Sequence, residues 1–221
     1  MTVWAILVAA GRGERLGLDQ PKAFAKLGED PLLAEPLRRL EESEWVDAIV
    51  LVAPPGWEEP AILLAEELGC GKVSACVPGG ETRADSVRAG LAEVPADAVV
   101  VLVHDAARPL LPPEVIERVL APLSEGWDGA VPGLPVADTL KRVAADGAVA
   151  ETVSRDGLWA VQTPQAFPAE VLRAAVADGA DASDCASLVE ARGGRVKVVA
   201  GDPRLLKVTT ADDLAKILLW L

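Results

Sequence analysis

The sequence predicts an α/β fold built on a doubly wound, mostly parallel sheet, and two observations carry this prediction. Short apolar runs rich in valine recur along the chain, and segments with helical periodicity separate them. Strands that alternate with helices form a mostly parallel sheet covered on both faces, and its buried strands read as continuous apolar runs. The expected strands are residues 3–9, 48–53, 72–77, 98–103 and 196–200.

Helices are expected where apolar residues recur every three or four positions, because that spacing places them on one helical face. The segments with this spacing are residues 61–68, 84–94, 115–123 and 214–221. Parallel strands end at one edge of the sheet, where ligands bind in doubly wound folds. We therefore expect the loops after the first, third and fourth strands to converge on one crevice.

Length and charge narrow the function classes. The chain has 221 residues and a formal net charge of −13, which suits a single domain over residues 1–221 and argues against a nucleic-acid partner. No apolar run approaches the roughly 20 residues of a membrane span and no leader precedes the first strand, so we expect a cytoplasmic protein. Three cysteines without metal-ligand spacing and a single histidine make disulfides, zinc and a Ser-His-Asp triad poor candidates.

Residues 133–164 interrupt the alternation of strands and helices with short polar and apolar runs around Asp146-Gly147. This pattern predicts a β-hairpin arm that projects from the main sheet. A solvated hairpin would explain its charges, but Trp159, Val161 and Phe167 would then need cover. An arm that reaches over a second subunit would provide that cover.

The loop after the first strand, "AAGRGERLG", begins like a G-x-G-x-x-G turn, but Leu16 stands where the third glycine should be and no P-loop signature follows. A glycine turn remains, whose backbone N–H groups can approach phosphate oxygens. Three cations flank it, namely Arg12, Arg15 and Lys22. A tight turn with solvated charges is the alternative, but cations clustered within an acidic chain favour a bound triphosphate.

The loop after the third strand reads "PGGETRADS". Thr82 and Asp85 have the spacing of a capping box at the start of a helix, which alone would explain both residues. Gly80, Glu81 and Ser86 could serve a base or a ribose, although the pattern by itself favours a structural role.

The loop after the fourth strand reads "HDAARP". Asp105 could bind a sugar hydroxyl or a metal ion and Arg108 a phosphate, while an internal ion pair between them is a serious alternative. His104 is better explained as a packed residue at the end of the strand than as a base. Lys207, just ahead of the last helix, either closes the crevice or belongs to the ordinary surface.

Taken in this order, the motifs resemble the 2-C-methyl-D-erythritol 4-phosphate cytidylyltransferase family of the non-mevalonate isoprenoid pathway. Each motif alone is a weak signal, but the ordered set spans nearly the whole chain. The motifs are "AAGRGERLG", "PKAF", "GGETRADSVRAGL", "HDAARP", "DTLKR", "LWAVQTPQAF", "ASDCASLVEARG" and "LKVTTADDL".

The resemblance implies a Rossmann-like nucleotidyltransferase fold and transfer of CMP from CTP to 2-C-methyl-D-erythritol 4-phosphate, with Mg²⁺ present and release of pyrophosphate. It implies that Arg15 and Lys22 stabilise charge on the attacked α-phosphate, and that Arg155 and Lys207 position the methylerythritol phosphate. The implied nucleotide pocket comprises Ala9, Ala10, Gly11, Arg12, Gly80, Glu81 and Ser86. The implied substrate contacts are Asp105, Arg108, Thr139, Arg155, Thr163 and Lys207.

In the family the arm crosses to the other subunit of a homodimer, so the resemblance implies that Arg155 and Thr163 act across the interface. The metal ligands remain unassigned by the motifs. The sequence departs from the family pattern at a few positions near these motifs, which concern fine positioning: Ala23-Phe24 for Gln-Tyr, Glu81 for aspartate, Ser183 for threonine and Leu205 for asparagine.

Three alternatives stay open at this point. The nearest is a cytidylyltransferase of the same fold that acts on another polyol phosphate, such as ribitol 5-phosphate. A nicotinamide-dependent oxidoreductase is disfavoured by the displaced third glycine and by the absence of a ribose-binding acid after the second strand. The third is a non-catalytic nucleotide-binding or dimerisation module.

Overall fold

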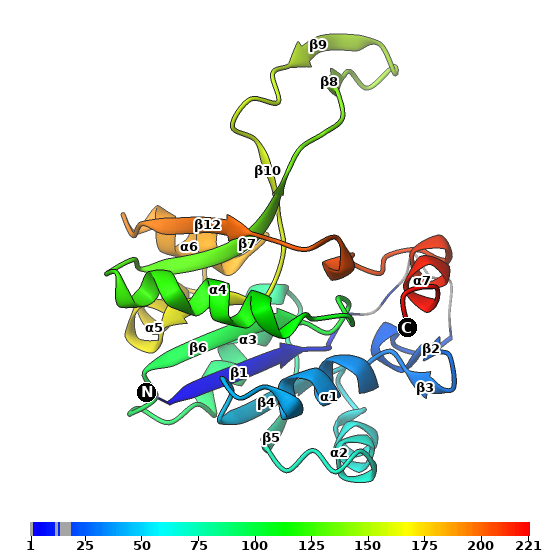
Figure 1. The fold of residues 1–221 in the computed structure, drawn as a ribbon, viewed down its shortest axis with the longest axis vertical. Coiled ribbons are helices and arrows are strands. Elements are labelled where there is room, and N and C mark those ends of the chain that lie inside the picture. The colour runs from blue at the N-terminus through cyan, green and yellow to red at the C-terminus, as the bar shows by residue number, and fades with distance from the viewer. Residues whose placement is uncertain (1, 12, 14–18) are drawn as a thin grey trace.

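The computed structural model describes residues 2–11, 13 and 19–221. Among these residues one eight-stranded sheet forms the centre, in the order β10-β7-β11-β6-β1-β4-β5, with β12 beside β7 (Figure 1). The strands are β1 (Val3–Val8), β4 (Ala48–Ala53), β5 (Val73–Pro78), β6 (Val100–Asp105), β7 (Gly129–Pro135), β10 (Trp159–Val161), β11 (Gln165–Pro168) and β12 (Val196–Ala200).

All five apolar runs of the sequence form strands of this sheet. β6, β1, β4 and β5 lie parallel to one another, as their continuous apolar character predicts. β7 and β11 were not expected as separate strands. β11 lies antiparallel between β6 and β7, so the sheet is mixed at this side and mostly parallel at the other.

Helices cover both faces of the sheet, so the doubly wound prediction is confirmed. Alternate residues of β1 separate the two layers, because Ala5 and Leu7 pack in one apolar cluster and Ile6 packs in the other. The first cluster includes side chains of α1 (Ala34–Glu42), α2 (Glu58–Glu67) and α4 (Pro113–Ser124). The second includes side chains of α3 (Arg83–Ala92), α5 (Ala169–Val176) and α6 (Cys185–Ala191).

The C-terminal helix α7 (Ala211–Leu218) packs through Ile217 in a third, smaller apolar cluster. That cluster also holds Leu27 and Leu32, beside the two-residue strands β2 (Lys26–Leu27) and β3 (Asp30–Pro31). The 3₁₀ turns η2 (Lys22–Phe24) and η3 (Pro203–Leu205) lead into these regions. None of the helices in the described part of the chain combines the length and the apolar character that a membrane span requires.

The expected hairpin projects from the body, but its boundaries differ from the prediction (Figure 1). Residues 133–135 and 159–161 pair as β7 and β10 within the main sheet. The projecting part, called the arm below, is residues 136–158, with β8 (Leu140–Val143) and β9 (Val149–Val153) at its end. Gly147 takes a φ of 86° in the turn between them, a conformation that favours glycine.

One residue assigned to the hairpin belongs elsewhere. Phe167, expected to need cover by a partner, is fully buried in β11 between two strands of the main sheet. Gly129 of β7 makes room for it, because a side chain at that position would collide with the phenyl ring. The apolar surface expected on the hairpin therefore consists of Trp159 and Val161, and the expectation for Phe167 was wrong.

Candidate functional site

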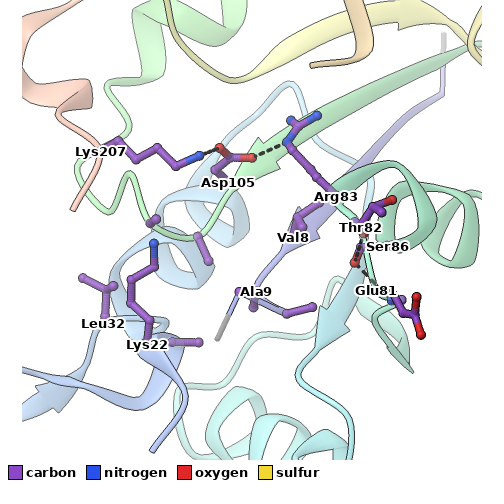
Figure 2. A pocket seen from close by; sticks show the side chains of 16 residues that line it. Val8, Ala9, Lys22, Leu32, Glu81, Thr82, Arg83, Ser86, Asp105 and Lys207 are labelled. Atoms are coloured by element: carbon purple, nitrogen blue, oxygen red, sulfur yellow. Dashed lines mark hydrogen bonds and ion pairs between the residues drawn. The ribbon is translucent and has the colours of Figure 1, made fainter. Parts of the chain in front are cut away.

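The three loops converge as expected. The chain runs from β1 to β4 and β5 on one side of β1 and then returns to β6 on the other, so β1 marks the point where the strand order reverses. Ligands bind beyond the carboxyl ends of strands at such a point. The pocket there is lined by Val8, Ala9, Ala10, Gly11, Lys22, Ala23, Leu32, Gly80, Glu81, Thr82, Arg83, Ser86, Asp105, Ala106, Ala107 and Lys207 (Figure 2).

The loop after β5 is held by its own side chains. The Thr82 hydroxyl accepts a hydrogen bond from the Asp85 amide at 3.1 Å, which confirms the capping box at the start of α3. Ser86 accepts from the Gly80 amide at 3.2 Å and donates to the Thr82 carbonyl at 3.0 Å. A side chain at Gly80 would collide with Asp85. The backbone of this loop is thereby fixed at the pocket wall before any ligand arrives.

Asp105, the last residue of β6, joins two cations at the pocket. Arg83 donates through Nε to one carboxylate oxygen at 3.0 Å, and Lys207 donates through Nζ to the other at 2.7 Å. Figure 2 shows the two cations approaching the carboxylate from opposite sides. Burial acts to raise the pKa of Asp105, but the charges of Arg83 and Lys207 outweigh it, so the pKa lies well below its usual range. Asp105 is therefore ionised at neutral pH.

A chain of hydrogen bonds with a fixed direction supports Asp105 from within the core. His104 Nε2 lies 3.1 Å from the Arg108 carbonyl, which can only accept, so this nitrogen carries the proton. Nδ1 must then accept from the Thr163 hydroxyl, 3.1 Å away, and that hydroxyl accepts from the Asp105 amide at 3.1 Å. Burial lowers the pKa of His104 to about 4, which keeps the imidazole neutral.

His104 is thus a packed residue at the end of its strand, as the sequence suggested. Thr163 is buried on its own chain's Asp105, so the expectation that Thr163 acts across a subunit interface was wrong. Thr163 lies next to the end of β6 because β11, which begins two residues later, pairs with β6. The chain therefore assigns Thr163 the task of holding the Asp105 backbone.

Arg108 is not among the pocket-lining residues. Its guanidinium donates to the Leu205 carbonyl at 2.5 Å and to the Val161 carbonyl at 3.4 Å. Its Nε is buried and finds no hydrogen-bond partner among the described residues. Arg108 forms no ion pair with Asp105, the alternative that the sequence left open. It connects the loop after β6 to β10 and to η3, the two segments at the base of the arm and before Lys207.

Of the three cations that flank the glycine loop, Lys22 is the one that the structure describes. Lys22 lines the pocket and donates through Nζ to the Val208 carbonyl at 3.1 Å. Gly13, with a φ of 69°, packs against the backbone and Cβ of Lys22, so a larger residue there would displace it. Arg12 and Arg15 lie outside the described residues.

The arm residues stay apart from the pocket in a single chain. Arg155 donates to the Ala137 carbonyl at the base of the arm, and neither Arg155 nor Thr139 is among the pocket-lining residues. Conversely, the sequence analysis missed Arg83, which lines the pocket and holds Asp105. Its position directly after the Thr82 cap, in a loop expected at the crevice, was the available signal.

The described residues contain no cluster of three or more carboxylate, imidazole or thiol side chains that could hold a metal ion. Both oxygens of Asp105 are occupied by cations. This arrangement fits a Mg²⁺ ion that is carried on phosphate oxygens of a ligand, the way Mg²⁺ binds in many nucleotide sites, and it does not form a protein cage for the metal.

Comparison with known proteins agrees with this geometry. Residues 3–220 match the family described as 2-C-methyl-D-erythritol 4-phosphate cytidylyltransferase. A relative of that name from Nocardia farcinica is 48% identical over 213 residues, covering 96% of this chain and 91% of that protein. One of the same name from Saccharopolyspora erythraea is 48% identical over 219 residues, covering 97% of each.

Solved structures with matching folds carry equivalent names. A 4-diphosphocytidyl-2C-methyl-D-erythritol synthase superposes with a TM-score of 0.84 at 35% identity, covering 99% of this chain and 97% of that chain. A 2-C-methyl-D-erythritol 4-phosphate cytidylyltransferase from Thermus thermophilus superposes with a TM-score of 0.80 at 34% identity, covering 97% of this chain and 96% of that chain. The chain, a nucleotidyltransferase by fold and by relationship, therefore belongs to the 2-C-methyl-D-erythritol 4-phosphate cytidylyltransferase family.

Proposed function

We propose that this pocket transfers CMP from CTP to 2-C-methyl-D-erythritol 4-phosphate, giving 4-diphosphocytidyl-2-C-methyl-D-erythritol and pyrophosphate. The observation that carries the proposal is the charge of the pocket. Among its described lining residues three cations, Lys22, Arg83 and Lys207, face two carboxylates, although the whole chain carries a net charge of −13. A locally cationic crevice in an acidic protein is suited to ligands that carry several phosphates.

The nucleotide end of the pocket is assigned to the first two loops. Ala9, Ala10 and Gly11 offer backbone groups and little side-chain volume, and the loop after β5 presents Gly80 and Glu81. Ser86 supports this loop from beneath through its bonds to Gly80 and Thr82. Small residues and a fixed backbone favour a pyrimidine over a larger purine, so we propose CTP as the nucleotide.

The phosphate end is assigned to the cations. When an oxygen of the acceptor's phosphate attacks the α-phosphate of CTP, negative charge grows on the equatorial oxygens and on the departing pyrophosphate. Fixed cations that meet this charge lower the barrier by electrostatics and positioning, without a covalent intermediate. We assign this role to Lys22 and Arg15, with Arg12 on the same glycine loop, and we assign the acceptor's phosphate to Lys207.

Mg²⁺ is proposed to enter with the triphosphate of CTP, where it neutralises phosphate charge. The protein's own task is then to hold the triphosphate and the acceptor in line. Asp105 is oriented for this by its backbone bond to Thr163 and by its two ion pairs, and it faces the pocket between the nucleotide end and Lys207. A hydroxyl of a bound sugar is the ligand group best suited to this carboxylate.

We further propose that the enzyme is a homodimer, in which each arm brings Arg155 and Thr139 to the partner's pocket. Supporting this, the strands at and beside the base of the arm expose apolar side chains. The side chains of Trp159 and Val198 flank Gly133, and Trp159, Val161 and Val198 are each about 40% exposed or more. Two-fold homodimers are the commonest assembly that covers such a surface.

The experiment is side-by-side turnover of CTP with 2-C-methyl-D-erythritol 4-phosphate and with ribitol 5-phosphate, measured by pyrophosphate release. Higher kcat/KM for the methylerythritol phosphate is expected. Preference for ribitol 5-phosphate would overturn the assigned acceptor, and comparable kcat/KM for ATP would overturn the assigned nucleotide.

We propose the cytoplasm as the location of the protein, because this reducing compartment suits the free cysteines Cys70, Cys76 and Cys185.

A further inference from the structure

Arg83 carries the observations that the assigned roles do not use. It is the first residue of α3, its side chain is about four-fifths buried, and its Nε contacts the carboxylate of Asp105. Its Nη1 lies 3.4 Å from the Cys185 sulfur at the start of α6, a weak acceptor. Its Nη2 is buried and finds no hydrogen-bond partner among the described residues.

This arrangement is a poor device for stability alone. A buried guanidinium with an unsatisfied donor and a thiol as one of its acceptors keeps much of its desolvation cost. Apolar residues of similar size often replace buried ion pairs at little cost to stability. The position of Arg83 beside a pocket carboxylate therefore calls for an explanation in the reaction.

The two cations on Asp105 differ in how they are held. Arg83 rises from a helix whose first turn is fixed by a capping box, and its guanidinium is enclosed between Asp105 and Cys185. Lys207 follows η3 on an irregular segment, and its side chain is 40% exposed, against 19% for Arg83. A flexible ammonium on the solvent side is the partner that can exchange, while the planar guanidinium in the core cannot.

We propose that Arg83 is a positioning residue of the transfer reaction: it holds Asp105 by one carboxylate oxygen, so that Lys207 can leave the other oxygen and bind the acceptor's phosphate. Without Arg83, Lys207 is the one ion-pair partner left to the buried Asp105 among the described residues, with the charge of Arg108 as a weaker influence, and Asp105 retains it. With Arg83 in place, Asp105 stays compensated while Lys207 moves. This inference rests on the proposed function, because it needs a phosphate acceptor at Lys207.

The test is the steady-state kinetics of Arg83→Met. Because Lys207 is then retained by Asp105, the KM for 2-C-methyl-D-erythritol 4-phosphate is expected to rise. An increase of about tenfold to a hundredfold corresponds to the loss of one charge-assisted hydrogen bond. The KM for CTP is expected to change far less. Arg83→Lys restores a cation beside Asp105 and is expected to recover part of the loss, which a purely steric role would not predict.

A double-mutant cycle with Asp105→Asn tests whether Arg83 acts through Asp105. If it does, Arg83→Met adds nothing to the KM of the Asp105→Asn enzyme. Arg88→Met is the matched control, since Arg88 lies on the same helix in a partly buried ion pair with Asp85 and does not line the pocket. Its KM values are expected to equal those of the wild type.

Several results would overturn the inference. They are an unchanged acceptor KM in folded Arg83→Met, a rise confined to the KM for CTP, which would mean direct contact with the nucleotide, or independent effects in the double variant. Arg83→Gln, which keeps a polar donor at the buried position, carries the same test in case the Met variant does not fold. Failure of the proposed function is recognised separately, because the wild-type enzyme would then not turn over 2-C-methyl-D-erythritol 4-phosphate.

Discussion

The pocket and the arm each contain ion pairs. The contrast between them shows that burial, more than distance, decides how strongly water screens an ion pair. In the pocket Asp105, with a side chain only 9% exposed, pairs with Arg83 at 3.0 Å and with Lys207 at 2.7 Å. In the arm Arg142 and Glu151 approach more closely, to 2.5 Å, with side chains 68% and 53% exposed. Water screens the arm pair strongly and the pocket pairs weakly.

The same contrast holds for how the two regions are organised. Within the chain, the carboxylate and loop backbone of the pocket and the histidine behind that carboxylate's strand end are fixed by internal hydrogen bonds. The arm is held to the body mainly by the pairing of β7 with β10. The pocket, which is preformed, and the arm, whose proposed role depends on a partner subunit, should therefore respond very differently to single substitutions. The expected effects are given from the largest to the smallest.

Loss of a phosphate-binding cation should have the largest effect. Lys22→Ala, and Arg15→Ala in parallel, are expected to lower kcat by about 10²–10³, because each removes one charge contact with the transition state. The substitution at 22 leaves the core intact, since the lysine is only partly buried at the pocket edge. Pyrophosphate release under saturating substrates measures kcat, and thermal unfolding checks the fold. A near-normal kcat in either variant would remove that residue from the chemistry.

The buried histidine should make stability fall in mild acid. Burial lowers the pKa of His104 from 6.5 in the unfolded chain to about 4 in the folded one, so the unfolded chain takes up a proton that the folded chain refuses. The contribution of this pKa shift to the free energy of unfolding is fully present above pH 6.5. It is lost as the pH falls towards 4, by about 1.4 kcal/mol per pH unit and about 3 kcal/mol in all. The depressed pKa of Asp105 makes the free energy of unfolding depend on pH only below pH 3.8, the ordinary pKa of this carboxyl group.

Urea unfolding at pH 7.5, 6.5, 5.5 and 5.0 measures this slope. His104 is the single histidine of the sequence, so the part of the window above pH 5 is assigned to it with little interference from carboxylates. His104→Gln is the control and should flatten the profile between pH 6.5 and 5. A wild-type free energy of unfolding that stays constant over this range would contradict the neutral, singly oriented imidazole.

Mixing two inactive variants tests the dependent arm. Arg155→Ala and Lys22→Ala protomers should each be inactive, and a mixed dimer pairs one intact arm with one intact glycine loop. With random exchange about half the dimers are mixed and each holds one working site, so about a quarter of wild-type activity should return. No recovery after verified subunit exchange would place Arg155 in its own chain's pocket. A fully active monomer at micromolar concentration would contradict the shared site altogether.

The apolar runs and loop positions allowed the sheet and the pocket to be predicted from sequence, because buried parallel strands and cap residues leave local signals. β4, for example, occupies the residues that its apolar run indicates. β7 escaped prediction because Gly129, Pro132 and Gly133 interrupt its apolar character, and the reason for these glycines lies in Phe167, Trp159 and Val198, far along the chain.

The same limit applies to the site. Thr163 meets Asp105 across 58 residues, through the pairing of β11 with β6, and no local pattern records that contact. Arg83 looks like an ordinary charged residue in the first turn of a helix, because its burial depends on Cys185, 102 residues away. Helix α1 was not predicted, although Ala34, Leu37 and Leu40 lie on one buried face at helical spacing, so for this element the signal was available in the sequence.

The smallest effect is expected at the ion pair of the arm. Arg142→Ala removes the contact with Glu151 on β9, but both side chains remain largely in water before and after the change. Exposed pairs of this kind contribute about 0–1 kcal/mol and less at high salt, so the free energy of unfolding should change by no more than that. Urea unfolding at about 0.05 M and 0.5 M NaCl measures it, with Glu151→Ala as the reciprocal variant and Arg83→Met as the buried counterpart. Since neither arm residue is assigned to a ligand, kcat/KM should stay at the wild-type value. A loss of several kcal/mol on removing Arg142, or a loss of activity without a change in stability, would show that the proposed contact of the arm with a partner subunit also covers this ion pair, and the contrast between arm and pocket drawn from exposure in the single chain would then no longer hold.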